Sequence, residues 1–289
     1  MKAVIGGANG LIGSALVRAL RTRGDEVVPL VRGAGGVKWD GRSVPGAALD
    51  GADAVVNLAG ASLAGKRWSE AYKQEIVESR VASTRAFVEA MRAARPRPRV
   101  LVNASAVGVY GGRGDEELTE ASAPGTDFLA GVCKAWEAEA QRAEELGVRT
   151  VPLRTGVVLA REGGALKQML PPFKAFVGGP IGSGKQWFPW IHIADEIGIL
   201  LWALDGAVRG PVIAAAPNPA RMKEFAQALG RALHRPAVFA VPALVLRLGL
   251  GEMAEVLLDG QRAVPRKALE GGYRFRFPEL PAALADLLG

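Results

Sequence analysis

Residues 5–13, which read IGGANGLIG, decide the fold of this chain. An apolar run leads into the glycines, and a helical pattern follows them. Such a strand–glycine–helix turn binds phosphate when Gly7 permits the turn, Gly10 lets the backbone approach a pyrophosphate and Gly13 allows the helix to pack on the strand. The helix N-terminus adds free N–H groups and a partial positive charge. The stretch therefore predicts a dinucleotide-binding turn.

The first half of the chain alternates short apolar runs with helical patterns, which predicts parallel βαβ units. We expect strands over residues 2–6, 26–31, 54–58, 99–105 and 150–159, and helices over residues 12–23, 69–94 and 128–146. The run AVVNLAG is almost continuously apolar, as is typical of a strand that is buried on both faces. The predicted fold class is α/β, with a Rossmann-type doubly wound parallel sheet.

From about residue 171 the sequence becomes rich in Gly, Pro and Trp. It predicts loops and short strands, a helix that begins near an N-cap at Asp195, a β-like run over 237–242 and a helix from Pro242. We expect residues 1–170 to form the dinucleotide-binding domain, with part of its sheet contributed later in the chain. Residues 171–289 would then form a smaller carboxy-terminal α/β lobe. A ligand is expected in the crevice at the carboxyl ends of the strands.

The composition narrows the possible functions. Of 289 residues, 49% are hydrophobic and 22% are charged, which is typical of a globular protein. The net charge is +7, but the arginines are scattered among acids, so we expect a basic surface that suits anionic ligands and no nucleic-acid partner. One cysteine and two histidines make a metal site improbable. No long apolar stretch or signal peptide is visible, so we expect a cytoplasmic protein that does not associate with membranes.

The GxxGxxG spacing and the stretch VVNLAGA at 55–61 resemble the short-chain dehydrogenase/reductase superfamily, in its extended, epimerase-like branch. The resemblance implies a nicotinamide dinucleotide as the cofactor. Besides the three glycines, it implies cofactor contacts from Asn9, Leu11, Ile12, Leu58, Ala59, Gly60, Arg80, Ala104, Lys134 and Arg154.

Arg32, at the end of the second predicted strand, indicates which dinucleotide is bound. An acid at this position would hydrogen-bond the adenosine ribose and repel a 2′-phosphate, whereas a guanidinium can hold the phosphate through two hydrogen bonds. We therefore predict NADP(H) rather than NAD(H).

The catalytic residues of the superfamily are only partly present. The superfamily uses a tyrosine, a lysine four residues later and a serine or threonine on the preceding strand. In NASAVGVYG at 103–111, Ala106 stands at the hydroxyl position and Ser105 precedes it. In FLAGVCKAWEAEA at 128–140, Lys134 matches the lysine, but Ala130 stands in place of the tyrosine. Alanine donates no proton, so the usual mechanism does not transfer intact.

Several residues can be considered in place of the missing acid. We assign candidate catalytic roles to Lys134, Tyr110 and Ser105. His192 titrates near neutrality in its unperturbed state, and Cys133 beside Lys134 would be reactive if its thiol had a low pKa. Packing roles remain the alternative for Tyr110, His192 and Cys133. The substrate pocket is expected to include Gln186, Trp187 and Trp190, because indoles offer stacking area and one donor each.

A closer resemblance covers nearly the whole chain. Its motifs include SAVGVYG, FLAGVCKAWE, GKQWFPWIHIADE and GEMAEVLLDGQRAVPRKALEGGYRFRFPEL. They are similar to an atypical extended, epimerase-like family that lacks the tyrosine and ends in a module of unknown function. This resemblance implies an NADP(H)-binding protein with a small-molecule substrate that is not identified, and a homodimer paired through two long helices.

Two functions fit the sequence. One is an oxidoreductase or epimerase-like enzyme that acts on a carbonyl or sugar-nucleotide-like substrate. The other is a catalytically silent NADP(H) sensor or scaffold. An open pocket with polar groups beside the nicotinamide would favour the enzyme, and a pocket plugged by tryptophans would favour the sensor.

Overall fold

A computed structural model describes the whole chain, residues 1–289, and its centre is a seven-stranded sheet with the order β11–β7–β5–β4–β1–β2–β3. All neighbouring strands in it are parallel. The strands are β1 (Lys2–Gly6), β2 (Glu26–Val31), β3 (Val37–Lys38), β4 (Ala54–Asn57), β5 (Val100–Ala106), β7 (Arg149–Thr155) and β11 (Val212–Ala214). The strand order reverses between β1 and β4, which creates the crevice in which this fold binds ligands. The predicted Rossmann-type α/β fold is confirmed.

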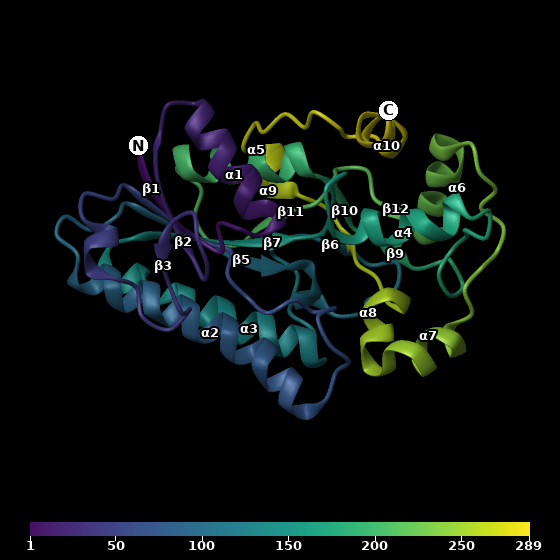
Figure 1. Ribbon diagram of the computed structural model, residues 1–289, viewed down its shortest axis with the longest axis horizontal. Coiled ribbons are helices and arrows are strands. Elements are labelled where there is room, and N and C mark those ends of the chain that lie inside the picture. The colour runs from purple at the N-terminus through teal and green to yellow at the C-terminus, as the bar shows by residue number, and fades with distance from the viewer.

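Helices cover both faces of this sheet (Figure 1): α1 (Leu11–Thr22) and α5 (Ile193–Asp205) lie on one face, and α2 (Glu70–Ala93) and α3 (Phe128–Gln141) lie on the other. The alternation of side chains along β1 explains how both faces are held. Ala3 and Ile5 join the core beneath α1 and α5, whereas Val4 joins the core beneath α2 and α3. Strands covered in this way must be apolar throughout, and all of β4 is buried.

The later part of the chain forms a smaller α/β lobe at one end of the sheet (Figure 1). Its core includes Phe188, Trp190 and Phe225, packed between three helices. These helices are α4 (Gly164–Lys174), α6 (Met222–Leu233) and α10 (Leu280–Leu288). Three strand pairs border the lobe: β8 (Val157–Leu159) with β10 (Trp190–His192), β9 (Trp187–Phe188) with β12 (Ala220–Arg221), and β6 (Glu117–Leu118) with β13 (Arg262–Ala263). The short helices α7 (Ala243–Leu250), α8 (Ala254–Leu258) and α9 (Arg266–Glu270) lie between α6 and α10 in the chain.

The structure corrects three local predictions. The strand expected over 150–159 is interrupted at Gly156, where the chain leaves the main sheet and continues as β8. Only glycine fits at this point, because a Cβ there would lie 2.1 Å from the carbonyl oxygen of Pro189. The N-cap of α5 is His192, whose ring nitrogen accepts from the Ala194 N–H, and not Asp195. The run over 237–242 forms no strand; its one β-type contact is an isolated bridge between Val241 and Ile181.

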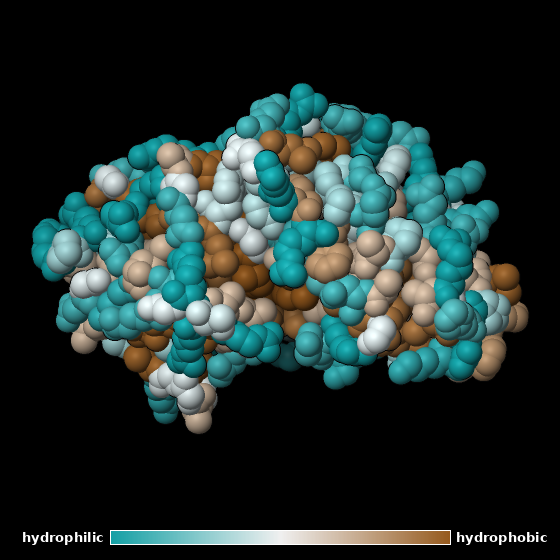
Figure 2. Space-filling model, turned by 90° about the horizontal axis from the view of Figure 1, so that it is seen from above, coloured by the Kyte–Doolittle hydropathy of each residue, from teal (hydrophilic) through white to brown (hydrophobic).

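The surface is mainly hydrophilic on the face shown in Figure 2, with apolar residues gathered toward its middle. None of the helices combines the length and the apolar character needed to cross a bilayer.

Candidate functional site

A groove runs over the carboxyl ends of the central strands and has a volume of about 420 Å³. The glycine loop after β1 forms one wall, with Gly7, Gly10 and Gly13 all among the lining residues. Gly7 has φ +76°, and a Cβ there would lie 2.8 Å from the Leu58 backbone. A Cβ at Gly13 would lie 2.2 Å from the carbonyl oxygen of Gly7, so both glycines are needed for the loop to close on the helix.

The start of α1 leaves donors available in this groove. Gly10 is the N-cap, so the helix has no side-chain cap, and its first turn contains no acidic residue. Leu11 and Ile12 line the groove beside it. An uncapped helix N-terminus binds anions through its free N–H groups and its dipole. This end of the groove fits a pyrophosphate.

Arg80 is the only charged residue that lines this groove. Its guanidinium donates to the carbonyl oxygens of Ile76 and Ala61 and lies 5.1 Å from the ring centre of Trp136. It forms no ion pair, and burial lowers its pKa. A partly buried cation without a counter-ion is unfavourable by itself, so the groove is electrostatically suited to an anionic ligand.

A second groove lies near the end of β2, where Arg32 lines it together with Arg42 and Ser43. Neither arginine forms an ion pair with an acid; Asp40, in the same groove, accepts instead from the backbone N–H groups of Arg42 and Ser43. The groove's other charged residues, Glu75, Glu78, Arg85 and Glu89, come from α2, so the end of the groove that Arg32, Arg42 and Ser43 line is the part suited to a phosphate group.

The other predicted cofactor residues divide into three sets. Leu58 and Ala104 line the first groove. Asn9 and Ala59 are next in sequence to lining residues but do not line it themselves, and Gly60 does not line it but lies against Arg80. Arg154 and Lys134 point elsewhere, as described below.

A cavity of about 420 Å³ continues from the first groove into the carboxy-terminal lobe. Groove and cavity share lining residues that include Ala106, Leu129 and Thr155. Most of the remaining wall is apolar: Trp68, Phe128, Met169, Phe188, Val256 and Leu257. Gln186 and Trp187 line the cavity, whereas Trp190 is fully buried in the core of the lobe. The prediction that Trp190 lines the pocket is therefore wrong, because its position in β10 faces the lobe's core.

The face that α3 presents to the groove differs from the one that the motif match implied. Leu129, Cys133 and Trp136 line the groove. Ala130 is fully buried, and Lys134 is exposed and donates to the Gly125 carbonyl oxygen at 3.3 Å. The two positions four residues apart that reach the groove are thus Leu129 and Cys133, one residue earlier than the motif match places them. The structure does not bring Lys134 to the cofactor groove.

We therefore expect Lys134→Ala to change the dissociation constant for NADPH by less than about twofold, because an exposed lysine of this kind contributes little. Fluorescence titration with NADPH measures this. Arg80→Ala, the comparison variant, should weaken binding clearly, since it removes the only cation of the groove. A large loss of NADPH affinity in Lys134→Ala would instead show that Lys134 contacts the ribose, as the resemblance implies.

Ser105, Glu137, Arg154 and Tyr110 form a buried network behind the groove. Arg154 donates to both carboxylate oxygens of Glu137, at 2.9 and 2.8 Å, and to the Tyr110 hydroxyl at 2.9 Å. Ser105 lines the groove, but its hydroxyl donates to Glu137 at 2.6 Å. Burial would lower the pKa of Arg154, but its hydrogen bonds and charge interaction with Glu137 raise it overall.

This network changes two predicted roles. Tyr110 is fully buried, and burial raises its pKa to about 12 despite the nearby Arg154. Its hydroxyl accepts from Arg154 and does not reach the groove or the cavity. Arg154 is likewise engaged with Glu137 and lines neither of them. Both residues support the floor of the site.

Thr155 and Glu196 form a pair that the sequence did not reveal. Thr155 lines both the groove and the cavity, and its hydroxyl hydrogen-bonds a carboxylate oxygen of Glu196 at 3.0 Å. The other oxygen of Glu196 has no partner, and no cation faces it. Burial raises the pKa of Glu196 to about 8, so this side chain carries a proton at pH 7.

The raised pKa of Glu196 predicts a pH-dependent stability. An acid with a higher pKa in the folded state contributes stability that is complete below its unfolded pKa and is lost as the pH rises through the folded value. Between pH 6.5 and 8.5 we expect the wild type to lose about 2 kcal/mol of unfolding free energy relative to Glu196→Gln. Urea unfolding of both proteins at the two pH values measures this difference. A constant difference would show that Glu196 is ionised throughout.

His192 and Cys133 do not provide the missing acid. His192 is buried as the N-cap of α5, its ring centre lies 3.9 Å from that of Phe277, and burial lowers its pKa. Cys133 lines the groove but is buried, and burial raises its pKa to about 11. The packing roles considered for these residues fit the structure.

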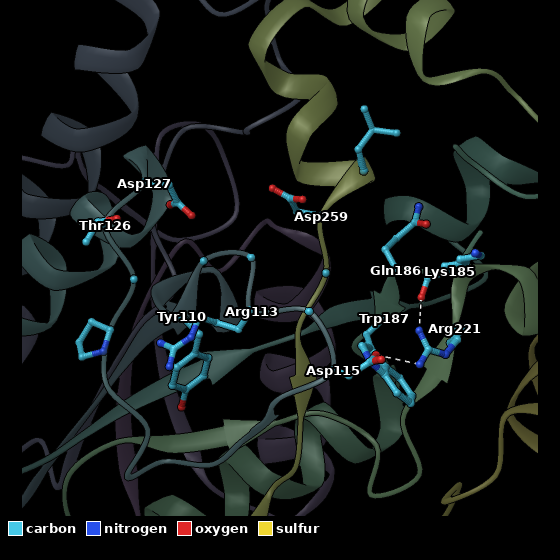
Figure 3. Close-up of a pocket in the computed structure, with 17 residues that line it drawn as sticks. Tyr110, Arg113, Asp115, Thr126, Asp127, Lys185, Gln186, Trp187, Arg221 and Asp259 are labelled. Carbon is cyan, nitrogen blue, oxygen red and sulfur yellow. Dashed lines mark hydrogen bonds and ion pairs between the residues drawn. The ribbon is translucent and has the colours of Figure 1, made fainter. Parts of the chain in front are cut away.

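A cavity rich in polar groups, shown in Figure 3, adjoins the apolar one. The two share Gly112, Asp127, Gln186, Trp187 and Asp259. Arg221 pairs with Asp115 at 2.8 Å and stacks on Trp187, with its guanidinium carbon 4.4 Å from the ring centre. Arg113 pairs with Glu116.

Comparisons with known proteins agree with this geometry. The model of the NAD-dependent epimerase/dehydratase family matches residues 3–214, and a domain of unknown function, DUF1731, matches residues 241–287. The epimerase family protein SDR39U1 of Mus musculus is 42% identical over 295 residues, covering 100% of both chains. The epimerase family protein YfhF of Bacillus subtilis is 38% identical, covering 100% of this chain and 98% of the relative. The crystal structure of human SDR39U1 with NADPH superposes with a TM-score of 0.92 at 38% identity, covering 100% of this chain and 99% of that one.

Proposed function

The chain belongs to the NAD-dependent epimerase/dehydratase family, and we propose that it is an NADP(H)-dependent oxidoreductase or epimerase-like enzyme that works without the superfamily's tyrosine. The observation that carries this proposal is Arg80. It is an unpaired cation in a groove that no acid lines, and that groove opens into a second, mainly apolar cavity. A dinucleotide in the groove and a substrate in the cavity would meet where Thr155 lies.

The choice of NADP(H) rests on the second groove and on the human relative. Arg32, Arg42 and Ser43 provide charge and donors for a 2′-phosphate. Human SDR39U1 was crystallised with NADPH. Gly7, Gly10 and the open start of α1 would hold the pyrophosphate.

An open cavity favours an enzyme over a silent sensor. The cavity volume of about 420 Å³ is sufficient for a small substrate. Trp187 forms part of its wall, and Trp190 lies in the core, so neither tryptophan plugs it.

The reduced nicotinamide would supply the hydride. Thr155 is the polar side chain best placed to hydrogen-bond a substrate carbonyl, because it lines both spaces. When Glu196 carries a proton, it can donate to the Thr155 hydroxyl, which in turn donates to the carbonyl oxygen. Glu196 would recover its proton from solvent after the alcohol leaves.

The test is to follow NADPH oxidation across a panel of carbonyl compounds and nucleotide sugars. We expect at least one member to be reduced, and Thr155→Val to lower kcat at least tenfold while Thr155→Ser retains activity. Tight NADPH binding with no turnover of any member would instead support the silent sensor. Equal activity of Thr155→Val and Thr155→Ser would show that the Thr155 hydroxyl takes no part in the mechanism.

We also propose a homodimer paired through α2 and α3, on the resemblance to extended relatives, and we assign residues 171–289 chiefly to the substrate lobe. The lobe's contribution to the cavity wall supports that assignment. Light scattering of the eluted protein measures the oligomeric state.

A further inference from the structure

The charged side chains that line the apolar cavity are all acidic. They are Asp127, Glu252, Glu255 and Asp259, and no lysine, arginine or histidine lines the cavity. The whole chain has a net charge of +7, so this concentration of carboxylates runs against the overall charge. The groove beside it has the opposite character, because its only charged residue is Arg80.

Two of the four carboxylates have no cation to balance them. Glu252 pairs with Lys73 at 3.0 Å, and Glu255 pairs with Arg247 at 2.8 Å. Asp127 and Asp259 form no ion pair, although Asp127 accepts from the Ala130 N–H as the N-cap of α3 and the positive charge of Arg247 acts on Asp259. Figure 3, which draws the adjoining polar cavity, shows their carboxylates pointing toward one another, one from the start of α3 and the other from the chain just after α8. Burial, and then the negative charges of Glu255 and Asp127, raises the pKa of Asp259.

The neutral polar groups have the same bias toward acceptors. Gln186 uses its amide nitrogen to donate to the carbonyl oxygens of Ile181 and Leu257, at 3.0 and 2.9 Å. Its amide oxygen is buried without a partner. Trp187 likewise donates its indole N–H to Asp115. The acceptors that the cavity wall exposes are therefore the carboxylates, and they complement a ligand that donates.

The adjoining polar cavity does not supply the missing positive charge. Arg221 and Arg113 are paired with Asp115 and Glu116. Lys185 forms no ion pair, and Figure 3 places it on the opposite side of the space from Asp127; Asp127, Asp259 and Lys185 are all exposed. A diphosphate in the space that the two cavities share would lie beside the carboxylates of Asp127 and Asp259.

We propose that the substrate is an apolar, preferably aromatic carbonyl compound that carries a positively charged amino group, and that nucleotide sugars are rejected. This proposal rests on the proposed function, since the carbonyl is assigned to the position beside the nicotinamide. The apolar walls take the hydrocarbon body, and Asp127 and Asp259 take the ammonium group.

Three benzaldehydes of matched shape test the proposal: 4-(dimethylaminomethyl)benzaldehyde, which is protonated at pH 7, its carbon isostere 4-isobutylbenzaldehyde, and the anion of 4-(carboxymethyl)benzaldehyde. Their dissociation constants are measured by calorimetry on the NADP⁺-loaded protein, which cannot reduce them, with UDP-glucose as the nucleotide-sugar probe. We expect the cation to bind about tenfold more tightly than the isostere. The anion and UDP-glucose should bind more weakly than the isostere.

Asp259→Asn should reduce the preference for the cation over the isostere to about threefold or less, with NADP⁺ affinity unchanged, because Asp259 does not line the groove. The matched control is Glu145→Gln, which removes the same charge at an exposed position outside the cavity and should leave the preference intact.

A stronger affinity for the isostere, the anion or UDP-glucose than for the cation would overturn the substrate class while leaving the proposed function in place. An equal loss of preference in Glu145→Gln would also overturn it, since the effect would then come from the overall charge. Failure of NADP⁺ itself to bind would refute the proposed function.

Discussion

Arg32→Glu is expected to weaken NADPH binding about hundredfold and to change NADH binding by less than about twofold. A hydrogen bond to a charged partner contributes about 1.5–3 kcal/mol, and the new carboxylate adds repulsion of the 2′-phosphate. Arg32 is exposed and forms no ion pair, so its replacement removes no internal contact. The effect should therefore depend on the 2′-phosphate alone.

Titration of the wild type and of Arg32→Glu with NADPH and with NADH measures this selectivity. Arg274→Glu makes the same charge change at another exposed arginine without an ion pair and should leave both constants unchanged. A similar loss for NADPH and NADH in Arg32→Glu would show that the arginine supports the loop instead of binding phosphate.

Arg154→Met is expected to destabilise the fold by about 3–5 kcal/mol, because it leaves the buried Glu137 without its cation. The pair is held by two hydrogen bonds of 2.9 and 2.8 Å, and both side chains are buried. The Tyr110 hydroxyl would lose its donor as well. Urea unfolding measures the change in unfolding free energy.

The double variant Arg154→Met/Glu137→Leu distinguishes two causes of destabilisation: loss of the ion pair, and burial of the Glu137 carboxylate without a cation. Removing both charges should recover much of the stability, since the remaining side chains are apolar and of similar length. A loss below about 1 kcal/mol in Arg154→Met alone would mean that water reaches Glu137 and that the network is not closed.

The glycine loop and the strand pattern were sufficient to predict the Rossmann-type sheet. Local sequence determines both features: glycine spacing sets the turn, and apolar strands such as AVVN require cover on both faces. The NADP(H) prediction also followed from a single side chain at a known place, the end of β2. The similarity over the whole chain to SDR39U1 of Mus musculus confirms the resemblance drawn from the motifs.

The orientation of side chains within elements was harder to predict. A one-residue difference on α3 turns the helix by about 100°, which exchanges Lys134 and Ala130 for Cys133 and Leu129 at the groove. Similarly, Arg154 and Thr155 are adjacent, but successive strand residues face opposite sides. Arg154 therefore joins the buried network, and Thr155 reaches Glu196.

Residues brought together from distant parts of the chain gave no sequence signal. Asp259 meets Asp127 only because the carboxy-terminal lobe folds back over the start of α3 (Figure 3). Glu196 becomes buried because α5 packs directly against the sheet. Neither burial nor the absence of a cation can be inferred from a short motif.

The central claim is that NADPH binds in the glycine-lined groove with Arg80, and that Arg32 and Arg42 of the second groove contact it as well. Calorimetric titration of the wild-type protein with NADPH, and with NADH in parallel, tests it most directly. We predict saturable binding of one NADPH per chain, at least about tenfold tighter than NADH. The absence of heat with both dinucleotides, or tighter binding of NADH, would contradict the account.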